Sequence, residues 1–316
     1  LLDWQSKAIE ARRLIYPVSP EVEDPNPRGN ARGGRGIAAH DDVVVVANYH
    51  TLQVYDRQLH HQRDISHPLM AGIHEVQACQ DRNISVASTA VDAVLVLGVE
   101  NGQLVQQYWP REMPGFQRQL NVTPLPIDKQ ADNRTQFLET RHSQSPSHLH
   151  LNAVATWSRE MHALFNAFGV IANLDRDEVV IRDKALRHGH NLLIEDDGTA
   201  IVNDTFGRAI RIYDLRTRTL ERIIDLTKHR WIRRLILKHQ LGYLARGILK
   251  KLLFHKLSAP RPVFVRGLDR LGDVLFVGIS PAAILFINWT SGELVDIYRY
   301  SSDVAVCIHG LKVWAE

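Results

Sequence analysis

The stretch HGHNLLIEDDGTAIVNDTFGRAIRIYDLRTRTLERIIDL, residues 188–226, decides the fold. It contains four short apolar runs, separated by turns at EDDG (195–198), FGR (206–208) and RTRT (216–219). Within it, AIRIYDL (209–215) alternates apolar and polar positions, as a half-buried strand does. The stretch therefore predicts four short antiparallel strands that follow one another in a meander.

The same order of apolar runs and turns recurs along the chain. The further full units are 35–65, 73–110, 150–183 and 265–300. Residues 307–316 look like the beginning of another unit, and residues 1–17 look like the end of one. A four-stranded unit of about 40 residues is one blade of a β-propeller. We therefore expect an all-β, six-bladed β-propeller, closed by strands from both chain ends and forming a single domain over 1–316.

Two segments break the repeat. Residues 110–147 are polar and rich in proline, and we interpret them as a long loop insertion. Residues 227–257 lie in a stretch without acidic residues, from Asp225 to Asp269, and their apolar positions recur with helical spacing. They predict two basic amphipathic helices, hinged near 240–242.

Two interpretations of the basic insertion stay open, and a third, nucleic-acid binding, is disfavoured. In the first, it is a lid whose apolar side packs on the propeller. In the second, it binds a membrane surface, because Trp, Leu and Phe on one side with Lys and Arg on the other suit anionic lipid. Nucleic acid is not expected as a partner, since no known nucleic-acid motif accompanies the charge.

Each unit, the partial C-terminal one included, carries a basic residue near the start of its first run. The first strand of every blade lines the central channel, so these positions should converge there. The predicted ring is Arg35, His74, His150, His190, Arg266 and His309. Glu75, Asn152 and Asn191 follow close behind it, and we expect the two asparagines and the two arginines to bind substrate.

The ring allows a water-filled channel with no ligand, or a ligand site. Neutral imidazoles bind Zn, Fe or Mn, so the histidines of the ring could hold one divalent transition metal. These candidate metal ligands are His74, His150, His190 and His309. The arginines would then bind a carboxylate, sulfate or phosphate. Without a metal, His150 or His190 would act as general acid, general base or nucleophile.

Several classes of function are disfavoured. Carboxylates are few near the ring, with Glu75 the best placed, which argues against a glycosidase with paired acids and against a calcium site. Two cysteines argue against a disulfide scaffold. The net charge of +3 is small, and no apolar run is long enough to span a membrane. We expect a cytoplasmic or peripheral-membrane location, with an upstream signal left open because the chain starts at Leu1 without Met.

The unit H-x-N-x-V followed by I-x-x-L-D, as in His150-Leu-Asn152 and 171–175, resembles blades of six-bladed propellers such as the bacterial arylsulfotransferases. The stretch 188–214 is similar to their repeat, and also to blades of strictosidine-synthase-like and lyase-type propellers. Residues 266–280 resemble uncharacterised bacterial propellers. In arylsulfotransferases a channel histidine takes the sulfuryl group, and the resemblance implies that role for His190 or His150. The insertion 227–257 departs from that family.

These observations lead to two hypotheses of different class. In the first, the central channel binds a small anionic substrate, with or without a metal, for a lyase, hydrolase or group-transfer reaction. In the second, the propeller is a non-catalytic scaffold that binds a protein or membrane partner through its faces and its basic helices.

Overall fold

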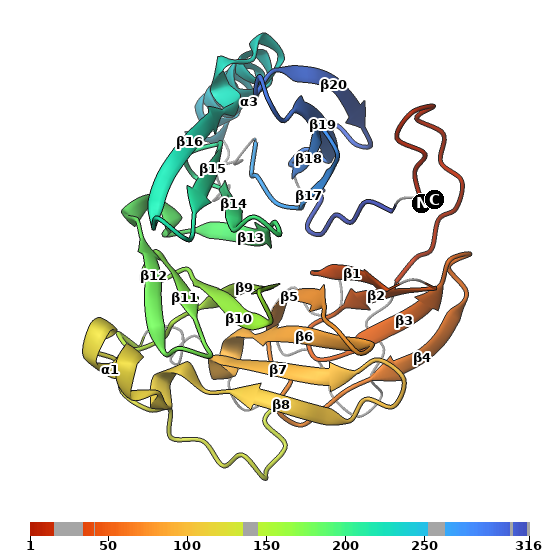
Figure 1. Cartoon of the computed structure of the whole chain (residues 1–316). Coiled ribbons are helices and arrows are strands. Elements are labelled where there is room, and N and C mark those ends of the chain that lie inside the picture. Colours follow the sequence, from red (N-terminus) through yellow and green to blue (C-terminus); the bar gives the residue numbers. More distant parts are fainter. Residues whose placement is uncertain (16–33, 41, 135–144, 252–262, 304–305, 315–316) are drawn as a thin grey trace.

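The computed structural model describes residues 1–15, 34–40, 42–134, 145–251, 263–303 and 306–314, and the side chains of 242–251 are left aside. Five four-stranded antiparallel sheets are arranged around a common centre (Figure 1). In every sheet the strands are paired in chain order, so each sheet is the meander that the sequence predicts. The chain is a β-propeller in which each full sequence unit forms one blade.

The blades have the following bounds. Blade 1 contains β1 (Ile37–His40), β2 (Val43–Ala47), β3 (Leu52–Asp56) and β4 (His61–Ile65). Blade 2 contains β5 (Ile73–Ala78), β6 (Asn83–Ser88), β7 (Ala93–Gly98) and β8 (Leu104–Tyr108). Blade 3 contains β9 (Leu151–Trp157), β10 (Glu160–Phe165), β11 (Val170–Asn173) and β12 (Glu178–Arg182). Blade 4 contains β13 (Gly189–Ile194), β14 (Thr199–Asp204), β15 (Ala209–Asp214) and β16 (Thr219–Asp225). Blade 5 contains β17 (Leu268–Leu271), β18 (Val274–Ile279), β19 (Ala283–Asn288) and β20 (Leu294–Arg299).

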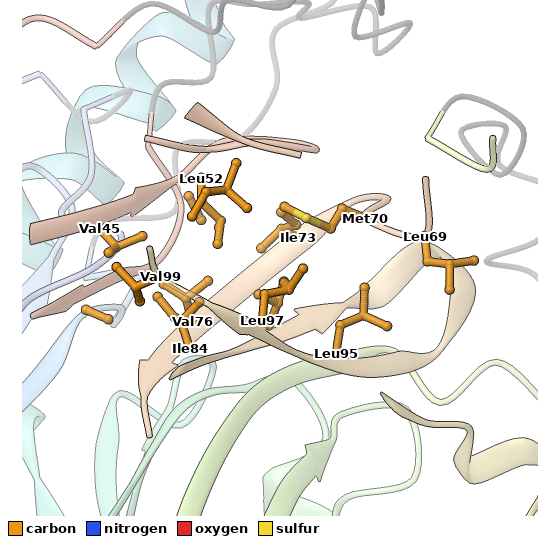
Figure 2. Packing of buried hydrophobic residues seen from close by; sticks show 14 of the residues in the cluster. Val45, Leu52, Leu69, Met70, Ile73, Val76, Ile84, Leu95, Leu97 and Val99 are labelled. Atoms are coloured by element: carbon orange, nitrogen blue, oxygen red, sulfur yellow. The ribbon is translucent and has the colours of Figure 1, made fainter. Parts of the chain in front are cut away.

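The hydrophobic core lies between neighbouring blades. A blade buries both of its faces, so its middle strands are apolar along their whole length, and all five residues of β2 are buried. Figure 2 shows the cluster between blades 1 and 2, where Leu52 and Val45 approach Ile73 and Val76. Similar clusters join blades 2 and 3, 3 and 4, and 4 and 5. The innermost strands β1, β5, β9, β13 and β17 face the centre (Figure 1).

The prediction of a sixth blade was wrong. Residues 1–15 contain only an isolated bridge, Leu2 to Ile9, and the described part of the C-terminal segment contains no strand. Both ends of the chain lie between blades 5 and 1 (Figure 1). Side-chain packing takes the place of strand pairing: Trp4 contacts the ring of Phe276, and Trp314 packs against the blade 1 cluster. The ring is closed at this position by terminal segments that form no sheet.

The C-terminal segment also joins the two blades directly. Lys312 pairs with the buried Asp269 of β17 at 3.0 Å. Nδ1 of His309 donates a hydrogen bond to the carbonyl of Arg35, ahead of β1, at 2.6 Å. The C-terminal segment thus contacts the innermost strand of blade 5 and the residues just before the innermost strand of blade 1.

Both insertions depart in detail from the prediction. The segment 110–147 contains a 3-10 turn, η3 (Pro110–Glu112), and a short helix, α1 (Pro114–Leu120), and its residues 135–144 lie outside the described part. The basic insertion begins with the turn η5 (Leu226–Lys228) and continues as one helix, α3 (Arg230–Lys251). The predicted hinge near 240–242 was therefore wrong. Residues 252–257 of the insertion lie outside the described residues. No helix in the described part of the chain is both long and apolar enough to cross a bilayer.

Candidate functional site

The predicted ring positions gather at the centre of the propeller, at the end where the innermost strands begin, and we call this place the channel mouth. His74 and His190 are the second residues of β5 and β13, and His150 directly precedes β9. Arg35 and Arg266 stand two residues ahead of β1 and β17. Every blade therefore presents the same end of its innermost strand, and His309 adds a sixth group from the C-terminal segment.

Arg266 binds two of the ring histidines at once. Its Nη2 donates a hydrogen bond to Nε2 of His190 at 2.7 Å, and its Nη1 donates to Nε2 of His309. Both imidazoles carry their proton on Nδ1, since Nδ1 of His309 donates to the carbonyl of Arg35 and Nδ1 of His190 lies 3.0 Å from the carbonyl of His188 and 2.8 Å from Thr205 Oγ1. The guanidinium is thus held between two imidazoles that each present a lone pair to it.

Burial and the charge of Arg266 keep His190 neutral. Desolvation lowers the pKa of His190 well below its ordinary value, and the guanidinium of Arg266 lowers it further. The same guanidinium also packs over the ring of Phe264, 4.6 Å from its centre. Neutral imidazoles accept hydrogen bonds without cancelling the charge of the arginine, so the positive charge of Arg266 remains in the site.

His74 and His150 form a second pair at the channel mouth, with ring centres 5.0 Å apart. Nδ1 of His74 contacts the carbonyl of Gly72 at 3.0 Å, which leaves Nε2 as the acceptor nitrogen. Desolvation, followed by the neighbouring His150 and Arg35, lowers the pKa of His74 well below its ordinary value. Desolvation and the adjacent His148 lower the pKa of His150 to about 4. Both side chains are therefore neutral near pH ~7.

A buried carboxylate, Asp92, holds the His148–His150 segment in place. Its side chain is fully buried and accepts hydrogen bonds from the backbone N–H groups of Leu149 at 3.0 Å and of His150 at 3.1 Å. It also pairs with His148 Nδ1 at 3.0 Å and with Arg111 Nη1 at 3.4 Å. These contacts support the left-handed backbone of His150, whose φ is 53°.

Asp92 was not among the site residues predicted from the sequence. Those residues lie on or beside the first strand of each unit, whereas Asp92 lies in the turn between the second and third strands of blade 2. In an antiparallel meander that turn returns to the end where the first strand begins. The corresponding turn of blade 4 brings Thr205 to His190 in the same way. Polar residues in the turn between the second and third strands of each repeat are the sequence signal that could have identified both Asp92 and Thr205.

A buried hydrogen-bonded network extends across the ring next to these groups. Asn191 of blade 4 donates from Nδ2 to Oε2 of Glu75 in blade 2. Its Oδ1 accepts from Asn203 Nδ2 at 3.0 Å and from the backbone N–H of Gly267 in blade 5 at 2.8 Å. Burial raises the pKa of Glu75 to about 8, so this carboxyl is protonated near neutral pH. The network connects three blades through neutral groups.

The expected substrate-binding asparagines are engaged with the protein. Asn191 belongs to the network just described. Asn152 is 2% exposed and donates to the carbonyl of Gly189 at 2.8 Å, which joins blade 3 to blade 4. Asn166 reaches the same carbonyl at 3.0 Å. The contacts of both predicted asparagines are therefore those of groups that hold blades together.

The described residues as placed form no assembled metal site, and the expected metal ion stays a prediction. Among them there is no group of three or more His, Cys, Asp or Glu side chains with the disposition of metal ligands. Arg266 occupies the Nε2 lone pairs of His190 and His309, and a metal ion would need these lone pairs. A metal bound by His74, His150, His190 and His309 would therefore require Arg266 to move away from both imidazoles. The arrangement instead matches hydrogen bonding around a cation.

Comparison with known proteins supports the fold. No protein-family model matches the sequence, and no curated protein matches it. A protein of unknown function from Bacteroides caccae superposes with a TM-score of 0.55 at 9% identity, over 95% of this chain and 88% of that chain. A streptogramin B lyase structure matches with a TM-score of 0.48 at 11% identity, over 84% of this chain and 68% of that chain. The computationally designed Ika8 protein matches with a TM-score of 0.42 at 12% identity, over 89% and 65%.

At 9% identity the likeness to the Bacteroides caccae protein supports the fold alone. It carries no evidence for the transfer activity that the resemblance to arylsulfotransferases implies, and that activity stays a prediction.

Proposed function

We propose that the channel mouth binds a small anion, with a carboxylate, sulfate or phosphate group, against Arg266 and Arg35. The observation that carries this proposal is the position of Arg266 between two neutral imidazoles, which fix its orientation and leave its charge intact. A guanidinium held in this way matches the planar geometry of an oxyanion and needs little reorganisation on binding. Desolvation is the largest cause of the lowered pKa values of His190 and His74, and nearby arginines are a further cause. The contribution of the arginines supports a positive potential at the same place.

Within this proposal the two predicted catalytic histidines have different roles. Both ring nitrogens of His190 are engaged, one with Thr205 and one with Arg266, so His190 positions the arginine. The imidazole of His150 makes ring contacts with His74 and His148, and no side-chain hydrogen bond to any described residue engages it. We assign His150 the role of proton acceptor or donor toward the bound anion.

Proton transfer at His150 is coupled to anion binding. A negative charge placed beside Arg266 offsets the cationic surroundings that help to depress the pKa of this imidazole, so binding raises its pKa toward neutrality. A base whose pKa rises when substrate binds is better matched to proton transfer near pH ~7. This chemistry suits a lyase or hydrolase that acts on an anionic substrate.

Anion binding measured by calorimetry tests the proposal, with sulfate, phosphate and acetate as probes. Arg266→Met should weaken binding about 10–100-fold, the effect of losing a hydrogen bond to a charged group. Arg266→Lys keeps the charge and should retain part of the affinity. Arg222→Met is a matched control. Arg222 is on β16, the outermost strand of blade 4, and its guanidinium also lies 4.6 Å from the centre of an aromatic ring, that of Trp289.

The outcome also separates the two classes of function. Equal affinities for the wild type, Arg266→Met and Arg222→Met would overturn the anion site and leave the non-catalytic scaffold as the better hypothesis. If anions bind, a loss of turnover in His150→Ala with affinity retained would distinguish catalysis from binding alone.

A further inference from the structure

We infer that the outward side of α3 is a docking surface for an anionic membrane. This side is defined by the exposed residues of the described part of the helix. They are Arg230, Arg233, Arg234, Leu237, Lys238, Gln240 and Leu241. The inference is independent of what binds in the channel.

The inward side of α3 is packed against the propeller. Ile232 is completely buried in the cluster between blades 4 and 5, and Trp231, Leu235 and Ile236 pack against the same cluster. The guanidinium of Arg299, at the end of β20, lies over the ring of Trp231, 4.9 Å from its centre. These contacts hold the first half of the helix, so its outward side has a defined orientation.

The outward side combines positive charge with exposed leucine. It contains four basic residues and no acidic one, and the chain has no acidic residue anywhere between Asp225 and Asp269. Leu237 is 54% exposed and Leu241 is 56% exposed, one helical turn apart. Basic residues attract the negative surface of an anionic bilayer, and leucines between them enter its boundary with the acyl chains. A nucleic-acid backbone would use the charges but would gain nothing from the leucines, which favours lipid.

The insertion that contains α3 starts at the same edge of the propeller as the channel mouth. Strand direction alternates within a blade, so the end of β16 lies at the same edge as the start of β13, which carries His190. The backbone N–H of Leu226, just after β16, donates to the carbonyl of Arg208 in the turn between β14 and β15 at 3.0 Å, which fixes the start of the insertion at this edge. The helix that carries the docking surface therefore starts at the edge of the propeller where the innermost strands begin.

Sedimentation with sucrose-loaded vesicles tests the inference. The whole protein should bind phosphatidylserine–phosphatidylcholine vesicles, should bind pure phosphatidylcholine vesicles weakly, and should lose binding as salt is raised. Arg233→Glu/Arg234→Glu should lower the partition coefficient by roughly 30-fold or more, since each basic residue contributes a factor of about five. Leu237→Ser/Leu241→Ser should lower it about tenfold or more, because two apolar side chains no longer leave water. All four positions are exposed, so the folded state should persist, as circular dichroism can check.

The matched control is Arg159→Glu/Arg216→Glu. It makes the same change of net charge in exposed turns at the opposite edge of the propeller, between β9 and β10 and between β15 and β16, and binding should be unchanged. Equal loss in this control and in Arg233→Glu/Arg234→Glu would overturn the inference, since net charge alone would then explain binding. Tighter binding to duplex DNA than to anionic vesicles, insensitive to Leu237→Ser/Leu241→Ser, would overturn it as well and would indicate a nucleic-acid surface.

Discussion

Replacing Glu75 by glutamine should change how the stability of the protein depends on pH. The Glu75 carboxyl is buried, and its pKa is raised from 4.5 to about 8 by burial. Between these values the folded protein holds a proton on Glu75 that the unfolded chain does not hold. Stability from this group is therefore fully present below pH ~4.5 and is lost as the pH rises through about 8.

The size of the effect follows from the pKa values. In this window the free energy of unfolding falls by about 1.4 kcal/mol for each pH unit, so it should fall by roughly 2–3 kcal/mol between pH ~5.5 and pH ~7.5. Glutamine has the same shape, can still accept the hydrogen bond from Asn191, and does not titrate. The variant should lack this part of the pH dependence and should become more stable than the wild type at alkaline pH.

Urea unfolding followed by tryptophan fluorescence measures the effect, since the chain has six tryptophans. The buried histidines act in the opposite direction: their lowered pKa values mean that stability is lost as the pH falls below their ordinary value of 6.5. This contribution is common to both proteins and cancels in the difference between wild type and Glu75→Gln. A difference that stays constant within about 0.5 kcal/mol over the window would refute the reasoning, because a carboxyl with an ordinary pKa contributes no slope there.

Further predictions concern the groups around the site. Asp92→Asn should lower the free energy of unfolding by about 3–5 kcal/mol, since it leaves Arg111 buried without its carboxylate. The same urea experiment checks this, and the cost of Asp92→Asn should be smaller in an Arg111→Met background; an equal cost in both backgrounds would contradict the pairing. Gly36→Ala should cost about 1–3 kcal/mol, because its Cβ would lie 2.7 Å from the backbone nitrogen of Val76. A thermal melt of Gly36→Ala equal to that of the wild type would show that the innermost strands of blades 1 and 2 can separate there.

The repeat of four-stranded units could be predicted from the sequence because it depends on local chemistry. Apolar runs alternating with turn residues specify a meander wherever they occur, and all five full units became blades. The sixth blade could not be judged in this way. Its expected pieces resemble parts of a unit, but whether they pair as strands depends on partners more than 250 positions away. In the fold, Trp4 and Trp314 fill the gap by packing.

The sequence likewise predicted one part of the candidate site and could not predict another. Equivalent positions in a repeat occupy equivalent places in a ring, so sequence phase alone brought together Arg35, Arg266 and the four histidines. The position of a residue within its repeat does not show which neighbour each histidine ring nitrogen contacts. In the structure His190 and His309 accept hydrogen bonds from Arg266, and Asn152 joins two blades, while metal and substrate binding by these residues stay predictions.

The sequence by itself determined the propeller repeat, the phase of the ring and the basic character of the insertion, because each is a property of neighbouring residues along the chain. Only the tertiary structure decided the number of blades, the role of Asp92 and the protonation of Glu75. Each of these depends on burial and on contacts between distant segments: Asp92 meets His148 56 positions away, and Glu75 meets Asn191 116 positions away. Desolvation and hydrogen-bond partners set the charge of a group, and both exist only once the blades have closed around it.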